Sequence, residues 1–219
     1  PNNLARILML GMLALVGLTF GRYKSLLRPI FITWPFILII GAALIQTGSR
    51  GGLIALAAGT MTLVLRRGTM MMKALNCAGL LALLGIFFFV ALQSDVMRTR
   101  FEETLEEGDL ARRELIYPTA WQMFQDKPLL GWGAINSTYE LGIRLGHPEE
   151  ETKNPHNLIL FGLVSTGIVG SLPLFIGIGF AAVSAWKTRH GPHGILPLAM
   201  FVAVLVANMS GLWLFNKLH

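Results

Sequence analysis

Long apolar stretches, separated by short polar segments, dominate the pattern of this chain. Six stretches come close to the length, about 20 residues, that a helix needs to cross a bilayer. They lie at approximately 4–20, 29–46, 49–65, 74–92, 168–186 and 194–215. Because backbone polar groups within a bilayer must be paired inside their own segment, we interpret each stretch as a helix.

The apolar stretch from Leu158 to Trp186 is too long for one upright span. Gly167, Gly170 and Pro173 interrupt it, and both residue types favour breaks in a helix. We therefore predict a short interfacial helix over 157–166, followed by a spanning helix over 168–186.

The window 93–156 is polar but retains aromatic residues and turn signals, which predicts an ordered loop that contains short helices. A segment over 112–124 reads as an amphipathic helix, with Leu115, Thr119 or Ala120, and Met123 along its apolar side. The predicted organisation is four spans over 1–92, the polar loop over 93–156, and the interfacial helix with two spans over 157–219.

Basic residues in the short loops predict the orientation of the spans. The loops 21–28, 66–73 and 187–193 carry eight Lys and Arg residues and no acidic residue, and with six spans they fall on one side. That side is expected to be cytoplasmic. The 47–50 turn and the 93–156 loop then face outward, to the periplasm or the cell exterior.

Composition and charge agree with a membrane protein. Apolar residues make up 53% of the 219 residues and charged residues only 14%, and the mean hydropathy is +0.59. All twelve acidic residues lie between Asp95 and Glu151, so the net charge of +6 combines a basic membrane part with an acidic loop. The single cysteine, Cys77, excludes an internal disulfide. The chain opens on Pro1 without a signal-peptide pattern, and we expect it to be a fragment.

Arg50 is the first candidate for chemistry, in the sequence Thr47-Gly-Ser-Arg-Gly-Gly52. An arginine that reaches the lipid headgroups would explain it. Alternatively, the glycines would let a phosphate approach both the guanidinium and the amide groups at a helix start. Ser49 lacks an evident His or Asp partner, which makes a serine nucleophile a weak idea.

Two further candidates lie in the outward loop. Arg112 and Arg113 fit either a surface ion-pair helix or a second phosphate clamp. His156 follows Pro155 where the loop meets the interfacial helix, and Asn157 or Asn154 could cap that helix. A neutral imidazole there could act as a general base on a hydroxyl, although a lone histidine is more often structural.

Acidic runs suggest metal sites only weakly. The run 102–109 lacks the spacing of an EF-hand loop, and a solvated helix face explains it better. Glu149, Glu150 and Glu151 could bind a metal together with His156, but a charged loop is the simpler interpretation. No metal or cofactor is therefore predicted.

Several short motifs follow one another along the chain. They are Gly48-Ser-Arg-Gly-Gly52, Arg113, the segment Ala120-Trp-Gln-Met-Phe-Gln-Asp-Lys-Pro-Leu-Leu-Gly-Trp-Gly133, Pro155-His-Asn-Leu-Ile-Leu160, and Thr166-Gly-Ile-Val-Gly170. Taken in order, they resemble those of the O-antigen ligase and polymerase family of polytopic membrane glycosyltransferases, and the resemblance covers roughly residues 30–190.

This resemblance implies an all-α, class C glycosyltransferase-like bundle with a large periplasmic loop, in the bacterial inner membrane. The implied donor is a glycan on undecaprenyl diphosphate, and for a ligase the acceptor is a sugar hydroxyl of lipid A–core. The implied transfer is inverting and needs no metal. By position, Arg50 and Arg113 match arginines that hold the diphosphate, Arg112 is a register alternative, and His156 matches the catalytic histidine. Asn157 and Ser49 are possible supporting residues.

Alternatives remain open at this point. A polysaccharide polymerase and a protein O-oligosaccharyltransferase share these motifs, and the compact outward loop favours the ligase only slightly. A transporter subunit is the non-enzyme alternative. Transporters usually place ionisable groups within their spans, whereas here the candidate groups gather at one face.

Overall fold

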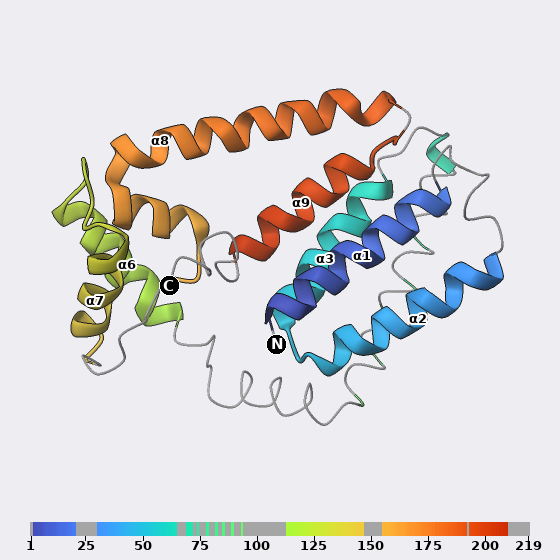
Figure 1. Ribbon diagram of the computed structural model, residues 1–219, viewed down its shortest axis with the longest axis horizontal. Helices are drawn as coiled ribbons and strands as arrows, with labels where there is room; N and C mark the ends of the chain where they lie inside the picture. The colour runs from blue at the N-terminus through green and yellow to red at the C-terminus, as the bar shows by residue number, and fades with distance from the viewer. Residues whose placement is uncertain are drawn as a thin grey trace. The chain divides into compact units, whose positions relative to one another are not determined.

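The computed structural model describes residues 2–20, 30–64, 69–71, 113–146, 155–191 and 193–209, with the single positions 74, 78, 82, 85, 89 and 93. Across these positions all regular elements are helices and no strand occurs, which confirms the all-α prediction (Figure 1). The chain divides into two compact units. Unit 1 comprises Pro1–Glu102 and Ala181–Ala207, and unit 2 comprises Glu103–Phe180 and Asn208–His219.

Some predicted features lie outside the described residues. They are Arg112, Asn154, the acidic runs 102–109 and 149–151, the basic loop 21–28, most of the basic loop 66–73, and the end of the last predicted span. Of the predicted span 74–92, the described positions 74, 78, 82, 85 and 89 are helical.

Unit 1 is built from long apolar helices. They are α1 (Asn2–Phe20), α2 (Ile30–Gln46), α3 (Arg50–Val64), the last turns of α8 (Leu158–Lys187), the short 3-10 helix η1 (Thr188–His190) and most of α9 (Leu196–Met209). The bounds of α1, α2 and α3 lie within two residues of the apolar stretches at 4–20, 29–46 and 49–65.

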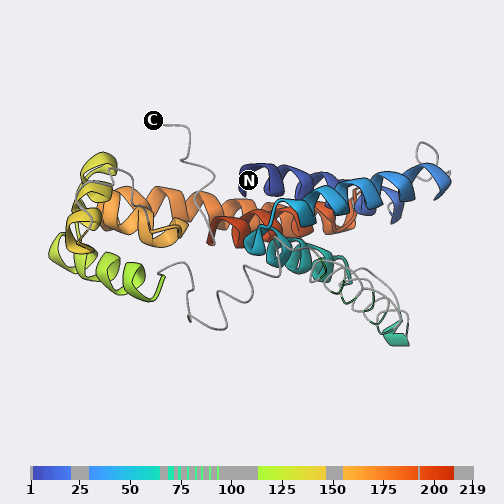
Figure 2. The same cartoon turned by 90° about the horizontal axis from the view of Figure 1, so that it is seen from below.

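Small residues let the helices of unit 1 pack closely. A Cβ atom added to Gly59 of α3 would lie 2.6 Å from Cδ1 of Leu13 in α1 and 3.0 Å from Cβ of Ala203 in α9. A Cβ atom added to Gly52 would lie 3.1 Å from Cβ of Ala5. Because these contacts advance together along both helices, α1 and α3 run parallel, and Figures 1 and 2 show them starting at the same end. Close approach through small residues is typical of helices that pack within membranes.

Unit 2 is built from α6 (Arg113–Asp126), α7 (Ala134–Arg144) and α8 as far as Phe180. Its core consists of Ile116, Ala120, Met123, Leu141 and Val164, with Tyr117, Phe124, Trp132 and Leu145 packed against it.

The predicted apolar face of the α6 helix needs a correction. Ile116, Ala120 and Met123 form the buried side, at spacings of four and three residues. Leu115, which we predicted to lie on that side, is 58% exposed. The predicted apolar side began at Leu115, one residue before the buried Ile116. Leu115 and Ile116 are both strongly apolar, so their spacing from Ala120 and Met123 does not show which of them is buried.

The helix α8 breaks at Gly167, the residue that separates the two segments predicted from the sequence. Gly167 has φ 63° and ψ −168°, which is not a helical conformation, and the chain changes direction there (Figure 1). Among the described residues, Leu158–His190 is the one helical stretch long and apolar enough to cross a membrane. Shorter apolar helices occupy Asn3–Gly17, Pro35–Gln46 and Leu196–Met209.

Candidate functional site

The break in α8 is filled by the backbone of the segment 128–133, which connects α6 to α7. The N–H groups of Trp132 and Gly133 donate to the carbonyl oxygens of Val164 and Ser165, at 2.9 and 2.7 Å. In return, the N–H groups of Ile168 and Val169 donate to the carbonyl oxygens of Pro128 and Leu129, at 2.8 and 3.2 Å. In an unbroken helix, Val164 and Ser165 would pair with Ile168 and Val169 instead. The connector therefore satisfies all four of these backbone groups.

Two glycines make this approach possible. A Cβ atom on Gly131 would lie 2.6 Å from the backbone of Val164, Ser165 and Gly167. A Cβ atom on Gly167 would overlap the carbonyl group of Leu129. Both glycines also have positive φ values, 66° and 63°, which side chains of L-residues rarely adopt.

Trp132 holds the connector against α6 and α7. Its Nε1 atom donates to the carbonyl oxygen of Met123 at 2.8 Å. The Nζ atom of Lys127 lies 3.7 Å from the ring centroid, and the guanidinium carbon of Arg144 lies 5.3 Å from it. The hydrogen bond of Arg144 to Glu140 raises the pKa of Arg144, as does its contact with Asp126, so the cation beside the ring is permanent.

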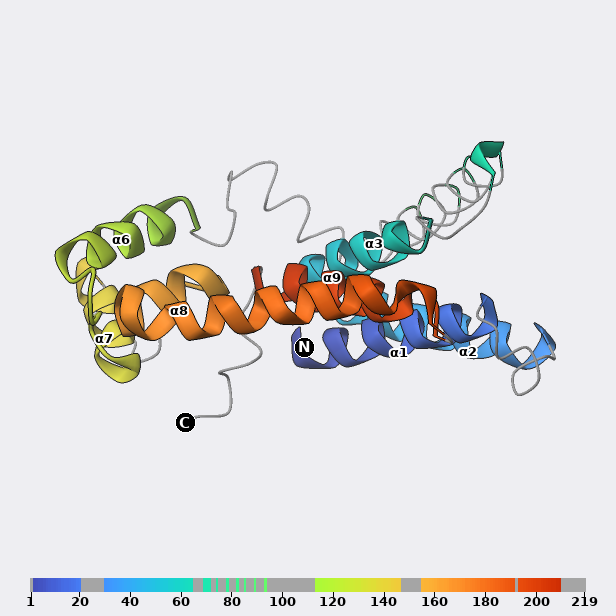
Figure 3. The same cartoon turned by 90° about the horizontal axis from the view of Figure 1, so that it is seen from above.

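The same contacts bring the starts of two helices to one end of unit 2. The C-terminal end of α6 leads directly into the connector, which is bonded to α8 at its break. Both α6 and the first segment of α8 (158–166) therefore run toward the break and are parallel, as Figures 1 and 3 show. Arg113 is the first residue of α6, and His156 lies two residues before α8. The two predicted site residues thus lie at the same end of unit 2.

His156 occupies an unusual backbone conformation. Its φ is 48°, and it is the one non-glycine residue with positive φ among the described positions. Its side chain is exposed, whereas the preceding Pro155 is buried and anchors the turn. A left-handed residue that is not glycine stores strain, and such strain concentrates at functional sites. The turn therefore presents the imidazole outward at the start of α8.

Asn157, one of the two cap residues considered from the sequence, is the N-cap of α8. Its Oδ1 atom accepts hydrogen bonds from the N–H groups of Ile159 and Leu160, at 3.0 and 3.2 Å. This role is structural, and it fixes where the helix begins relative to His156.

Replacing Asn157 with alanine is expected to destabilise the first turn of α8 by about 1 kcal/mol, because two N–H groups lose their acceptor. Hydrogen exchange followed by mass spectrometry should show faster exchange of the amides of Ile159 and Leu160. Asn157→Ser keeps an acceptor oxygen and serves as the control. Unchanged exchange in the alanine variant would contradict the capping role.

Arg113 and Arg50 occupy similar positions in the two units. Arg113 is half-buried at the first position of α6, and its Nε atom is buried. Arg50 is half-buried at the first position of α3. The hydroxyl of Ser49 accepts the N–H of Gly52 at 3.2 Å, so Ser49 caps α3. Each arginine thus stands at the positive end of a helix dipole.

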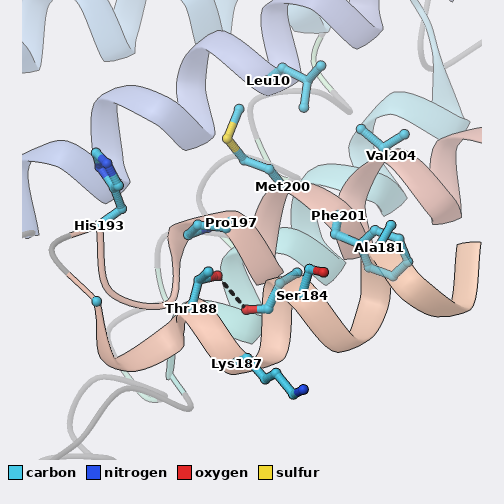
Figure 4. Close-up of a pocket in the computed structure, with 12 residues that line it drawn as sticks. Leu10, Ala181, Ser184, Lys187, Thr188, His193, Pro197, Met200, Phe201 and Val204 are labelled. Atoms are coloured by element: carbon cyan, nitrogen blue, oxygen red, sulfur yellow. Dashed lines mark hydrogen bonds between the residues drawn. The ribbon is translucent and has the colours of Figure 1, made fainter.

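A groove of about 710 Å³ lies in unit 1. It is lined by α1, the end of α8 and α9, and its lining is mostly apolar (Figure 4). None of the predicted site residues lines this groove. The groove therefore does not support the chemistry predicted from the sequence.

Motif matching does not identify one charged residue that the structure buries. Arg6 of α1 is 6% exposed, although it lies in an apolar helix. The signal in the sequence is that Arg6 alone interrupts its apolar stretch.

Comparison with known proteins yields one family and one relative. The model of the O-antigen ligase family matches residues 35–175. The chain is 30% identical over 192 residues to a protein named O-antigen ligase from Pseudomonas aeruginosa. That match covers 84% of this chain and 42% of the relative, so the chain spans less than half of that protein's length. No solved structure matches the chain.

The family match covers more than half of the chain and includes the turn before α3, the start of α6, the connector and the His156 turn. These are the segments that carry the sequence motifs and the geometry described above. The chain belongs to the O-antigen ligase family.

Proposed function

We propose that this protein is a glycosyltransferase of the inner membrane that moves a glycan from undecaprenyl diphosphate to a sugar hydroxyl of lipid A–core. Membership of the O-antigen ligase family supports glycan transfer in general. The donor, the acceptor and the residue roles are part of the proposal. The reaction inverts the anomeric centre and uses neither a metal nor a cofactor.

The proposed chemistry uses a base and cations. The acceptor hydroxyl oxygen attacks the anomeric carbon, and the bond from that carbon to the diphosphate oxygen breaks. His156 takes the hydroxyl proton as general base. Arg50 and Arg113, or Arg112 in the alternative register, offset the negative charge that develops on the undecaprenyl diphosphate leaving group.

The shared end of α6 and the first segment of α8 is the observation that best supports this proposal. The four backbone bonds at the break fix the direction of both helices. As a result, Arg113 and the His156 turn belong to one end of one small core. A cation and a base at the same end of unit 2 are what glycan transfer from a diphosphate carrier requires.

The membrane arrangement is also part of the proposal. Basic residues gather in the loops 21–28, 66–73 and 187–193, which favours the cytoplasm for that side. The opposite, periplasmic side then carries the Arg50 turn and the 93–156 loop, in a multi-pass bundle. Cysteine accessibility labelling at Thr69 and Gln122 tests this arrangement, because the two positions should label from opposite sides.

Reconstitution with defined acceptors tests the proposed function. The protein in proteoliposomes is given labelled undecaprenyl-diphosphate glycan with lipid A–core, with a second carrier-linked glycan, or with an acceptor protein. Transfer to lipid A–core supports the ligase. Preferential transfer to the carrier-linked glycan or to protein would replace it with a polymerase or an O-oligosaccharyltransferase. Solute uptake without any glycan transfer would support a transporter.

Replacing Arg50 with lysine should weaken donor use about tenfold to a hundredfold, because a point charge cannot reproduce the two-pronged guanidinium contact with a diphosphate. The measurement is KM for the donor in the same assay. Arg189→Lys is the matched control. Arg189 is also half-buried, but it lies in the predicted cytoplasmic loop 187–193 and stacks on Trp186. Equal KM values for wild type and Arg50→Lys would count against the diphosphate role.

A further inference from the structure

Arg6 lies inside unit 1 as a buried cation. Its side chain is 6% exposed, and its Nη1 atom donates to Oδ1 of Asn3 at 3.2 Å. The amide of Asn3 is neutral, so this hydrogen bond orients the guanidinium without compensating its charge. A charge buried in an apolar helix is costly, and such residues usually serve a function.

The described part of unit 1 offers no carboxylate to Arg6. All acidic residues of the chain lie between Asp95 and Glu151. The acidic residues that the structure describes are Glu114, Asp126 and Glu140, and all of them belong to unit 2. Among the described residues of unit 1, the charge of Arg6 thus has no carboxylate partner, and an anion supplied from outside the chain would compensate it.

The register of α1 against α3 places Arg6 at the start of α3. Leu13 meets α3 at Gly59, and seven residues earlier on both parallel helices, Arg6 stands level with Gly52. Seven residues make almost two full turns, so Arg6 shares the helix face of Leu13. The contact between Ala5 and Gly52 agrees with this register. Gly52 has no side chain, which lets Ala5, the neighbour of Arg6 in α1, approach the first turn of α3 closely.

The register therefore places two arginines, one from α1 and one from α3, at the level of the first turn of α3. Arg50 opens that turn, and Arg6 stands level with Gly52, two residues further on. The helix start adds partial positive charge. Ser49 caps the turn with a neutral hydroxyl rather than a carboxylate. An anion with several oxygen atoms, as in a diphosphate, suits two guanidinium groups better than a single carboxylate would.

We propose that Arg6 is a second guanidinium of the anion site at the start of α3, and that a bound diphosphate contacts both Arg6 and Arg50. This inference rests on the proposed function, because it assigns a further binding residue to the donor. Arg6 is a binding residue here and takes no part in proton transfer.

The test measures binding of undecaprenyl diphosphate, without sugar, to the protein in nanodiscs by native mass spectrometry. Arg6→Met keeps an unbranched side chain but removes the charge. Replacing a buried charge with an apolar group of similar shape is often neutral or stabilising. We therefore expect an unchanged or higher thermal midpoint, together with binding weakened about tenfold or more. The Arg6→Met change should weaken binding of undecaprenyl monophosphate less than binding of undecaprenyl diphosphate. A purely structural role of Arg6 would lower the thermal midpoint and leave binding by the folded protein unchanged.

Matched variants separate the possible outcomes. Gly11→Ala lies on the same helix, where an added Cβ atom has no neighbour within 4 Å, and it should bind like wild type. If Arg50→Lys weakens binding and Arg6→Met does not, the inference about Arg6 is wrong and the proposed function stands. If neither variant weakens binding, the diphosphate role of Arg50 fails as well. If Arg6→Met does not insert, Arg6→Lys replaces it, and wild-type binding by the lysine variant overturns the inference.

Discussion

Replacing His156 with alanine is expected to reduce glycan transfer about 100-fold to 10,000-fold, which is the usual contribution of a general base. The acceptor hydroxyl would then have to lose its proton to water. Donor binding should change little, because the diphosphate contacts are assigned to arginines. The measurement is the transfer rate at saturating donor, together with donor binding in nanodiscs.

The backbone at His156 complicates the alanine variant, since φ is 48° there and alanine tolerates this conformation poorly. His156→Asn is the matched control, because asparagine adopts left-handed conformations readily but cannot act as a base. Both variants should be equally inactive. An active asparagine variant beside an inactive alanine variant would assign a conformational role to His156. Normal transfer by both would remove it from the mechanism.

Replacing Gly167 with alanine should detach the 128–133 connector from α8. The added Cβ atom would overlap the carbonyl group of Leu129, and alanine also disfavours the φ of 63°. Four backbone hydrogen bonds depend on this approach. At about 0.5–1.5 kcal/mol for each bond, the free energy of unfolding should fall by about 2–6 kcal/mol. The thermal midpoint should fall, and limited proteolysis should cut within 128–133.

Gly177→Ala is the control for this change. Gly177 lies in the second segment of α8, and an added Cβ atom there has no neighbour within 4 Å. Alanine should stabilise the helix at that position, by about 0.5–1 kcal/mol. If both variants have the same thermal midpoint and the same proteolytic pattern, the close approach at Gly167 does not stabilise the protein.

Local signals predicted much of this fold. Apolar stretches located α1, α2 and α3, because helices in an apolar environment need continuous apolar sequence. Gly167 located the break in α8, although the helix continues through Gly170 and Pro173, which were also predicted to interrupt it. Of the two predicted cap candidates, Asn157 caps the helix and Asn154 lies outside the described residues. These features depend on residues that are neighbours in the chain.

Features that depend on distant residues were not predictable from the sequence. The bonds between 128–133 and 164–169 join segments whose hydrogen-bonding groups are backbone atoms, which every residue carries. The buried side of α6 depends on Val164 and Leu141, so the sequence of α6 alone did not distinguish Ile116 from Leu115. The close packing of α1 on α3 depends on Gly52 and Gly59, which lie on another helix than Ala5 and Leu13.

The roles of the candidate residues came from another kind of signal. Resemblance to the family's motifs is the source of the roles proposed for Arg50, Arg113 and His156, because these residues stand at matching motif positions. It could not assign a role to Arg6, which belongs to no such motif. The role proposed for Arg6 comes instead from the register of α1 against α3.

The bonded break in α8 also constrains the biogenesis of the protein. The connector 128–133 precedes α8 in the chain, so the ribosome releases it before the break that it completes. A helix that entered lipid with Val164, Ser165, Ile168 and Val169 unpaired at the break would expose backbone groups at a cost of several kcal/mol. The polar loop must therefore fold early enough to meet α8 as it emerges, or α8 must insert straight and break only afterwards. In the proposed membrane arrangement, insertion of this helix is therefore tied in either case to folding of the 128–133 connector.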